Sequence, residues 1–181
     1  ACLCAIADGR REGYHAMVAA GFVLRIDDPR LVTYYVAKPT LAVEQCRKWA
    51  ELRVEVLNYA IRNIPSEQVR FHTCYGINIG PRIHDMPLQD IVDIMLKINV
   101  GAYSFEAANP RHEHEWRMWE TVQLPEAKVL IPGVISHTTN LIEHPELVAE
   151  RLVQYANIVG RERVIAGSDC GFSSFASAEP E

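Results

Sequence analysis

A histidine and a cysteine stand two positions apart in the stretch RFHTCYG, which covers residues 70–76. The run that contains them has the composition of a short β-strand, and alternate residues of a strand point to the same face. His72 and Cys74 would therefore share one face, with Cα atoms about 6.6 Å apart, while Thr73 points to the other. An imidazole nitrogen and a thiolate sulfur on one face can bind a single zinc ion, at about 2.0 and 2.3 Å respectively. Two ligands do not complete a zinc site, so further ligands must come from elsewhere in the chain.

Glu106 and Cys170 could complete such a set, because each lies at or just beyond the end of a later β-type run. Soft thiolates combined with imidazole favour zinc over magnesium or calcium. An H-x-C pair also arises often by chance, a buried cysteine is commonly a small hydrophobic residue, and a glutamate at a strand end is commonly a surface charge. The spacing alone therefore leaves both a zinc site and ordinary packing open.

Five short β-type runs, separated by helical patterns, would have to position these residues. The runs cover residues 22–27, 69–74, 101–106, 128–134 and 163–168. Apolar residues recur at helical spacing over residues 41–64 and 88–98, and a third helical pattern has Pro145 near its start and Gly160 just past its end. Strands that alternate with such helices predict βαβ units and a parallel sheet, in which functional residues gather at the carboxyl ends of the strands.

The composition is that of an ordinary globular protein, with 181 residues, of which 49% are hydrophobic and 23% charged. It predicts one α/β domain over residues 1–181. The net charge of −5 argues against nucleic acid as a partner. The sequence has no apolar run near 18 residues and no recognisable signal peptide, so we expect a cytoplasmic protein without a membrane partner. The spacing of the five cysteines does not suggest a disulfide framework, and reduced thiols are expected.

Several stretches taken together resemble the C-terminal catalytic barrel of the cobalamin-independent methionine synthase family. They are QVRFHTCYGIN, AYSFEAANPRHEHEW, VLIPGVISHTTN and VIAGSDCGF, with VLRIDDP similar to the IDEP strand end of that family. The resemblance covers about residues 21–172 and implies a (β/α)8 TIM barrel, of which the chain carries only about five C-terminal βα units. It also implies that catalytic zinc is bound by His72, Cys74, Glu106 and Cys170.

The reaction implied by the resemblance is methyl transfer from methyltetrahydrofolate to homocysteine, which gives methionine. Asp27 matches the Asp of the IDEP element and would bind the amino group of homocysteine, and we expect Ser104 to be a second substrate-binding residue. His137 lies one residue away from the family's spacing, near the position of a histidine that can protonate the departing folate nitrogen. We further hypothesise that Glu106, a hard oxygen ligand in a soft site, is displaced when the substrate thiol binds.

Five strands do not close an eight-stranded barrel, and an open half would expose sheet edges. We therefore expect a fragment, a truncated reading frame or one part of a split protein, covered by the missing barrel half or by a second copy of the chain. Alkyl transfer to another thiol such as coenzyme M is an alternative, and so is a non-catalytic zinc-binding fragment. Decarboxylation, as in the related uroporphyrinogen decarboxylases, would leave the ligand set unexplained. The alternating charges of RHEHEW favour a solvated helical face over a second metal site.

Overall fold

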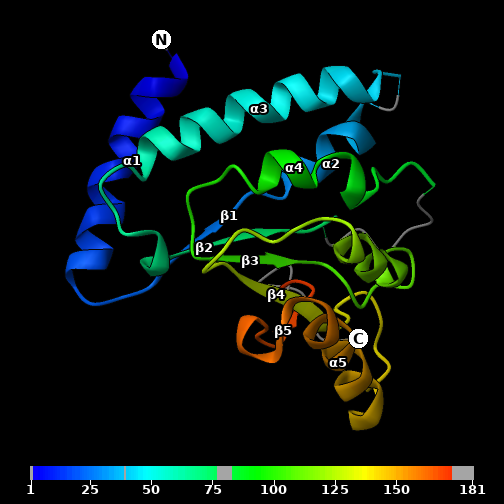
Figure 1. Ribbon diagram of the computed structural model, residues 1–181. Coiled ribbons are helices and arrows are strands. Elements are labelled where there is room, and N and C mark those ends of the chain that lie inside the picture. Colours follow the sequence, from blue (N-terminus) through cyan, green and yellow to red (C-terminus); the bar gives the residue numbers. More distant parts are fainter. Residues whose placement is uncertain (1, 39, 77–82, 173–181) are drawn as a thin grey trace.

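The computed structural model describes residues 2–38, 40–76 and 83–172, and its centre is a parallel sheet. The five strands are hydrogen-bonded in chain order, and the sheet curls into half of a barrel (Figure 1). Their bounds are β1 (Leu24–Asp27), β2 (Val69–Thr73), β3 (Ala102–Phe105), β4 (Val129–Ile135) and β5 (Gly167–Ser168). The predicted fold class, an α/β partial TIM barrel, is therefore confirmed.

The last strand is shorter than its predicted range of 163–168. Only Gly167 and Ser168 pair with β4 as a strand, and Val164 forms an isolated bridge to Leu130. The register shifts between Gly133 and Ile135 of β4, which interrupts the ladder on this side. The start of the predicted strand instead forms a 3-10 turn, η4 (Arg161–Arg163).

Helices follow each of the first four strands, and one more precedes the sheet. The α-helices are α1 (Cys2–Ala19), α2 (Arg30–Ala37), α3 (Val43–Ala60), α4 (Val92–Met95) and α5 (Pro145–Val159), and the other 3-10 segments are η1 (Ser66–Gln68), η2 (Leu88–Asp90) and η3 (Glu113–Glu120). The predicted patterns over 41–64 and 145–160 correspond to α3 and α5. Among the described helices, none is long and apolar enough to cross a membrane.

Two helical expectations differ from the structure. The pattern over residues 88–98 forms only η2 and the short α4, because Ile91 has a φ of −137° and interrupts the helix between them. The sequence patterns did not predict α1. This helix contains Gly9 and Gly13, which have low helix propensity, and Ala7 is the only fully buried residue among its described side chains.

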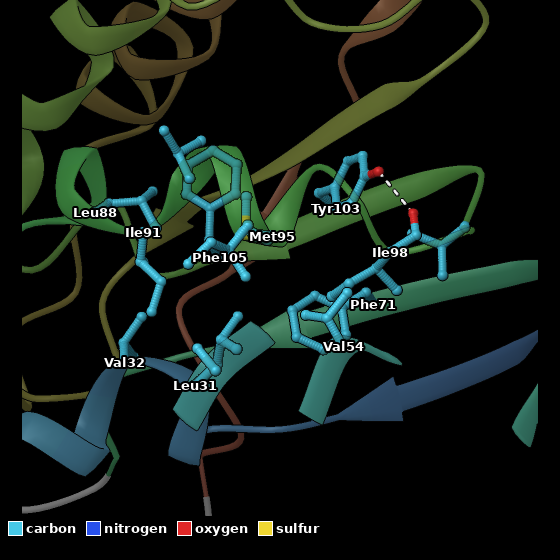
Figure 2. Close-up of a cluster of buried hydrophobic side chains, with 14 of the residues drawn as sticks. Leu31, Val32, Val54, Phe71, Leu88, Ile91, Met95, Ile98, Tyr103 and Phe105 are labelled. Carbon is cyan, nitrogen blue, oxygen red and sulfur yellow. Dashed lines mark hydrogen bonds between the residues drawn. The ribbon is translucent and has the colours of Figure 1, made fainter. Parts of the chain in front are cut away.

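The hydrophobic core lies between the sheet and the helices that follow it. Four cross-strand partners, one from each of β1 to β4, form a buried row: Ile26, Phe71, Tyr103 and Leu130. Figure 2 shows Phe71 and Tyr103 packed with residues of α2, α3, η2 and α4. The Tyr103 hydroxyl donates a hydrogen bond to the Ile98 carbonyl at 2.9 Å, so the one polar atom of this ring is paired. Because alternate residues of a strand point to opposite faces, His72 and Ser104 point to the face of the sheet away from these helices.

Candidate functional site

Strand register places predicted site residues on one face of the sheet. Asp27 is the cross-strand partner of His72, and His72 is the partner of Ser104. Partners in adjacent parallel strands point to the same side, opposite the helix-facing row that contains Phe71. All three lie at or near the carboxyl ends of their strands, where parallel α/β folds build their sites.

Three of the four predicted zinc ligands come together, and we call His72, Cys74 and Cys170 the thiol set. Their ligand atoms lie within 4.8 Å of one another, and the two sulfur atoms are 3.5 Å apart. Cys74 follows β2 and Cys170 follows β5, so three strand spacings separate them, or about 14 Å in a flat sheet. The curl of the sheet therefore brings the two cysteines together.

His72 is held in an orientation suited to a metal ligand. Its Nδ1 lies 2.9 Å from the Ser104 hydroxyl, while its Nε2 is buried and has no hydrogen-bond partner among the described residues. Burial, with a contribution from Arg25, lowers the pKa of His72 to about 4. The ring is therefore neutral at pH 7. A metal-binding histidine characteristically uses one nitrogen for the ion and hydrogen-bonds the other, so this imidazole fits a metal.

Burial keeps the Cys74 thiol protonated when no metal is bound. It raises the pKa of Cys74 to about 12, and the neighbouring Cys170 thiol and Glu106 carboxylate act in the same direction. Zinc binds thiolates, so metal binding must release the proton of Cys74. Two sulfur donors and a neutral imidazole whose buried Nε2 is unpaired among the described residues together fit zinc better than a hard cation.

Glu106, the fourth predicted ligand, lies beside the thiol set and outside it. One carboxylate oxygen accepts a hydrogen bond from the Tyr75 backbone N–H at 2.7 Å, and the other accepts one from the Asn109 side-chain amide at 2.6 Å. Polar atoms of Glu106, His137 and Asp169 lie within 4.8 Å of one another, and we call these residues the carboxylate set. The predicted four-residue ligand set is thus distributed over two adjacent clusters.

His137, the predicted proton donor, belongs to the carboxylate set. It is half-buried in the loop after β4, and its Nε2 lies 3.3 Å from the Gly76 carbonyl. Its Nδ1 is buried without a hydrogen-bond partner in the described part of the chain. The fold therefore brings His137 next to Glu106, and its role in proton transfer stays a prediction.

The loop that carries His137 is fixed by a buried ion pair. Arg151 of α5 contacts the Glu143 carboxylate and donates a hydrogen bond to the Val134 carbonyl at 3.0 Å. Glu143 in turn accepts a hydrogen bond from the Ser136 backbone N–H at 3.0 Å. These contacts hold the loop on both sides of His137.

Asp27 is in neither cluster. Its side chain is 57% exposed and forms an ion pair with Arg25 at 2.8 Å. The adjacent Asp28 instead points to α3, where Arg53 binds its carboxylate at 2.7 Å. A cavity of about 290 Å³ next to both aspartates is lined mainly by α1 and α3, and none of the predicted zinc ligands lines it. The predicted contact of Asp27 with a substrate amino group stays a prediction.

The expectation of a solvated face over RHEHEW was wrong for His112. This histidine is 3% exposed, its ring stacks on Tyr75 with centroids 3.5 Å apart, and its Nε2 lies 3.2 Å from an Asp85 oxygen. The segment η3 that follows is a 3-10 helix with three residues per turn, so His112, Glu115 and Met118 point inward together. The described residues contain two groups able to hold a metal ion, and His112 belongs to neither.

Asp169 is a site residue that sequence reasoning missed. It is wholly buried, and burial raises the pKa of its carboxyl to about 7. Its position directly before Cys170 in GSDCGF was visible in the sequence. The sequence alone did not indicate that the carboxylate would turn inward toward Glu106.

Known structures of methionine synthases share this fold. No protein-family model and no curated protein sequence matches the chain. The structure is similar to a B12-independent methionine synthase from Shewanella sp. W3-18-1 in complex with selenomethionine, with 20% sequence identity and a TM-score of 0.70 over 95% of this chain and 48% of that one. It is also similar to a protein of Listeria monocytogenes assigned as a vitamin-B12-independent methionine synthase, with 18% identity and a TM-score of 0.63 over 92% of this chain and 47% of that one.

The chain spans about half the length of these two structures. At identities near 20% the likeness concerns the fold alone. The resemblance predicted from the short motifs is therefore confirmed at the level of architecture: the curled sheet of five parallel strands is similar to part of the fold of these two structures.

Proposed function

We propose that this chain provides the zinc centre of a methyltransferase that transfers a methyl group to the thiol of homocysteine. The observation that carries the proposal is the convergence of His72, Cys74 and Cys170, from distant parts of the sequence, within 4.8 Å. The shared architecture with B12-independent methionine synthases, one of them in complex with selenomethionine, supports the proposed reaction. Methyltetrahydrofolate is the proposed methyl donor.

The residues of the thiol set would hold the zinc ion. His72 would use its free Nε2 while Ser104 fixes the ring, and the two cysteines would bind as thiolates. Zinc, when bound, would lower the pKa of the acceptor thiol and so keep its sulfur in the nucleophilic thiolate form. Two thiolates balance the charge of the ion, so the centre favours an electron-rich sulfur over the activation of water.

The surrounding residues would bind and orient the substrates. Glu106, which accepts a hydrogen bond from the N–H of Tyr75 directly after Cys74, is the proposed exchangeable fourth ligand, and its two hydrogen bonds would hold it when the substrate thiol takes that place. His137, beside Glu106, is the proposed proton donor to the departing folate nitrogen. Asp27 presents a carboxylate on the face that contains His72 and would pair with the ammonium group of homocysteine.

X-ray absorption at the zinc edge tests the proposal directly. The zinc-loaded chain should show two sulfur neighbours, and homocysteine should add a third. Homoserine, which has a hydroxyl in place of the thiol, is the matched control and should leave the spectrum unchanged. A chain that binds zinc but gains no sulfur from homocysteine would instead be a zinc-stabilised fragment, and the proposed function would be wrong.

The identity of the acceptor is tested by transfer assays on the same preparation. Homocysteine and coenzyme M are compared, with methyltetrahydrofolate, methylcobalamin and an epoxide as donors. Methionine formation from methyltetrahydrofolate supports the proposal. Product formed only from coenzyme M and an epoxide would identify an alkyltransferase on the same zinc centre.

A further inference from the structure

Asp169 links the strand ends that carry two of the proposed zinc ligands. We propose that it is a positioning residue that fixes Glu106 relative to the thiol set. The inference rests on the proposed zinc centre, and it assigns a role to a residue outside the predicted ligand set. Asp169 is 0% exposed, so its contacts are made entirely within the protein.

One oxygen of Asp169 binds the backbone next to Glu106. Its Oδ1 accepts hydrogen bonds from the N–H groups of Ala107 and Ala108, at 2.7 and 2.8 Å. These are the two residues that directly follow Glu106, and Asp169 itself directly precedes Cys170. A single side chain therefore connects the backbone carrying the carboxylate ligand to the backbone carrying a thiol ligand.

Strand β4, which lies between β3 and β5, leaves room for this link. The Asp169 backbone N–H donates to the Ile135 carbonyl at 3.0 Å. At Gly133, an added Cβ would lie 2.0 Å from Asp169 Oδ1 and 2.7 Å from the Asp169 backbone nitrogen, closer than such atoms approach. Glycine at this position lets Asp169 reach across β4 to Ala107 and Ala108.

The second oxygen of Asp169 is unpaired in the part of the chain that the structure describes. Its Oδ2 is buried and forms no hydrogen bond there, and Asp169 as a whole belongs to the carboxylate set with Glu106 and His137. A buried carboxylate oxygen without a hydrogen-bond partner lowers the free energy of unfolding. A contribution to stability therefore does not by itself account for an aspartate at this position. An asparagine would keep the accepting oxygen while removing the carboxylate, which allows the backbone link to be tested apart from the charge.

Zinc affinity, measured by competition with a chromophoric chelator, tests the link. Asp169→Ala should weaken zinc binding by about 10- to 100-fold, more than a change of the Glu106 carboxylate alone, because it also releases the backbone that carries the Cys170 thiol. Asp169→Asn should stay within about threefold of the unmodified chain, because its carbonyl oxygen can still accept both N–H groups. The cobalt-substituted protein should show a changed sulfur-to-metal charge-transfer spectrum in Asp169→Ala and an unchanged one in Asp169→Asn.

A matched control separates positioning from general stability. Asp28→Ala removes another mostly buried carboxylate at a strand end, one paired with Arg53, and should lower the unfolding temperature without changing the cobalt spectrum. Unchanged zinc affinity in Asp169→Ala, or equal losses in Asp169→Ala and Asp169→Asn, would overturn the proposal.

Hydrogen exchange in the unmodified, metal-free chain tests the same contacts without a substitution. The amide protons of Ala107 and Ala108 should exchange slowly before any metal is added, because Asp169 Oδ1 already accepts both. Unprotected exchange at these two positions would contradict the link even if Asp169→Ala fails to fold. Failure of the chain to bind zinc would contradict the proposed function and leave this measurement interpretable.

Discussion

The thiol set and the carboxylate set lie side by side at the same end of the sheet, yet their polar atoms are used differently. In the thiol set, His72 Nε2 has no hydrogen-bond partner among residues 2–38, 40–76 and 83–172, and the sulfur atoms of Cys74 and Cys170 contact each other at 3.5 Å. In the carboxylate set, both oxygens of Glu106 and one oxygen of Asp169 accept hydrogen bonds from nearby backbone or amide groups. The first set has free donor atoms for an ion, whereas the second is largely satisfied by the protein.

This difference suggests that the two sets have different roles at the proposed zinc centre. Soft donor atoms that make few other contacts among the described residues give affinity. Hydrogen-bonded oxygens give an exchangeable ligand, since the protein can hold the carboxylate when the ion does not. Substitutions in the two sets should therefore differ strongly in their effect on zinc affinity.

Loss of a sulfur ligand should have the largest effect. Cys74→Ser or Cys170→Ser should weaken zinc binding by about 1,000-fold or more, because a serine hydroxyl is a far weaker zinc ligand than a thiolate and the proposed centre has only two sulfur ligands. Cys4→Ser, which changes an exposed cysteine of α1, is the control and should leave affinity unchanged. Chelator competition gives both values, and a small loss in Cys170→Ser would remove this residue from the ligand set.

Zinc affinity should depend steeply on pH. The Cys74 thiol, whose pKa is raised by burial to about 12, is protonated in the metal-free protein and releases its proton on binding, so the apparent affinity should rise by at least about tenfold per pH unit between pH 6 and pH 8. His72 adds no proton in this range, because its pKa lies near 4. Titrations at several pH values measure the slope, and an affinity that does not change with pH would contradict binding through the Cys74 thiolate.

Removing the hydroxyl that orients His72 should have an intermediate effect. Ser104→Ala leaves Nδ1 without its partner, and we expect zinc affinity to fall by about tenfold. Ser136→Ala removes another buried hydroxyl, which pairs with Thr138 outside the thiol set, and is the matched control. Equal affinities in the two variants would show that Ser104 does not support the metal ligand.

The smallest change in zinc affinity is expected when the Glu106 carboxylate is replaced. Glu106→Gln should keep zinc within about tenfold of the original affinity and keep both sulfur neighbours in X-ray absorption, because it lies outside the thiol set. It should nevertheless slow methyl transfer if Glu106 is the ligand that the substrate thiol replaces. Full activity together with unchanged coordination would contradict that exchange.

Much of this arrangement could be predicted from the sequence. Alternation in RFHTCYG predicted that His72 and Cys74 share a face, and their ligand atoms do converge in the structure. The alternation of strand and helix patterns correctly predicted the parallel sheet. These features follow from local periodicity, which a single sequence displays directly.

The remaining features depend on contacts between distant segments. No spacing in the sequence indicates that a Glu106 oxygen would bind the Tyr75 backbone, or that Ser104 would bind the ring of His72. Asp169 was missed for the same reason, because its partners lie more than 60 residues away along the chain.

The 3.5 Å separation of the two sulfur atoms has a consequence for handling the protein. Thiols this close can be joined by an oxidant such as a peroxide once one of them loses its proton, and a disulfide would remove both sulfur ligands in one step. Because burial raises the pKa of Cys74 to about 12, we expect this oxidation to be slow at neutral pH and faster in alkaline solution. The cross-link would covalently connect the end of β2 to the end of β5, and the oxidised protein would take up zinc again only after treatment with a reductant.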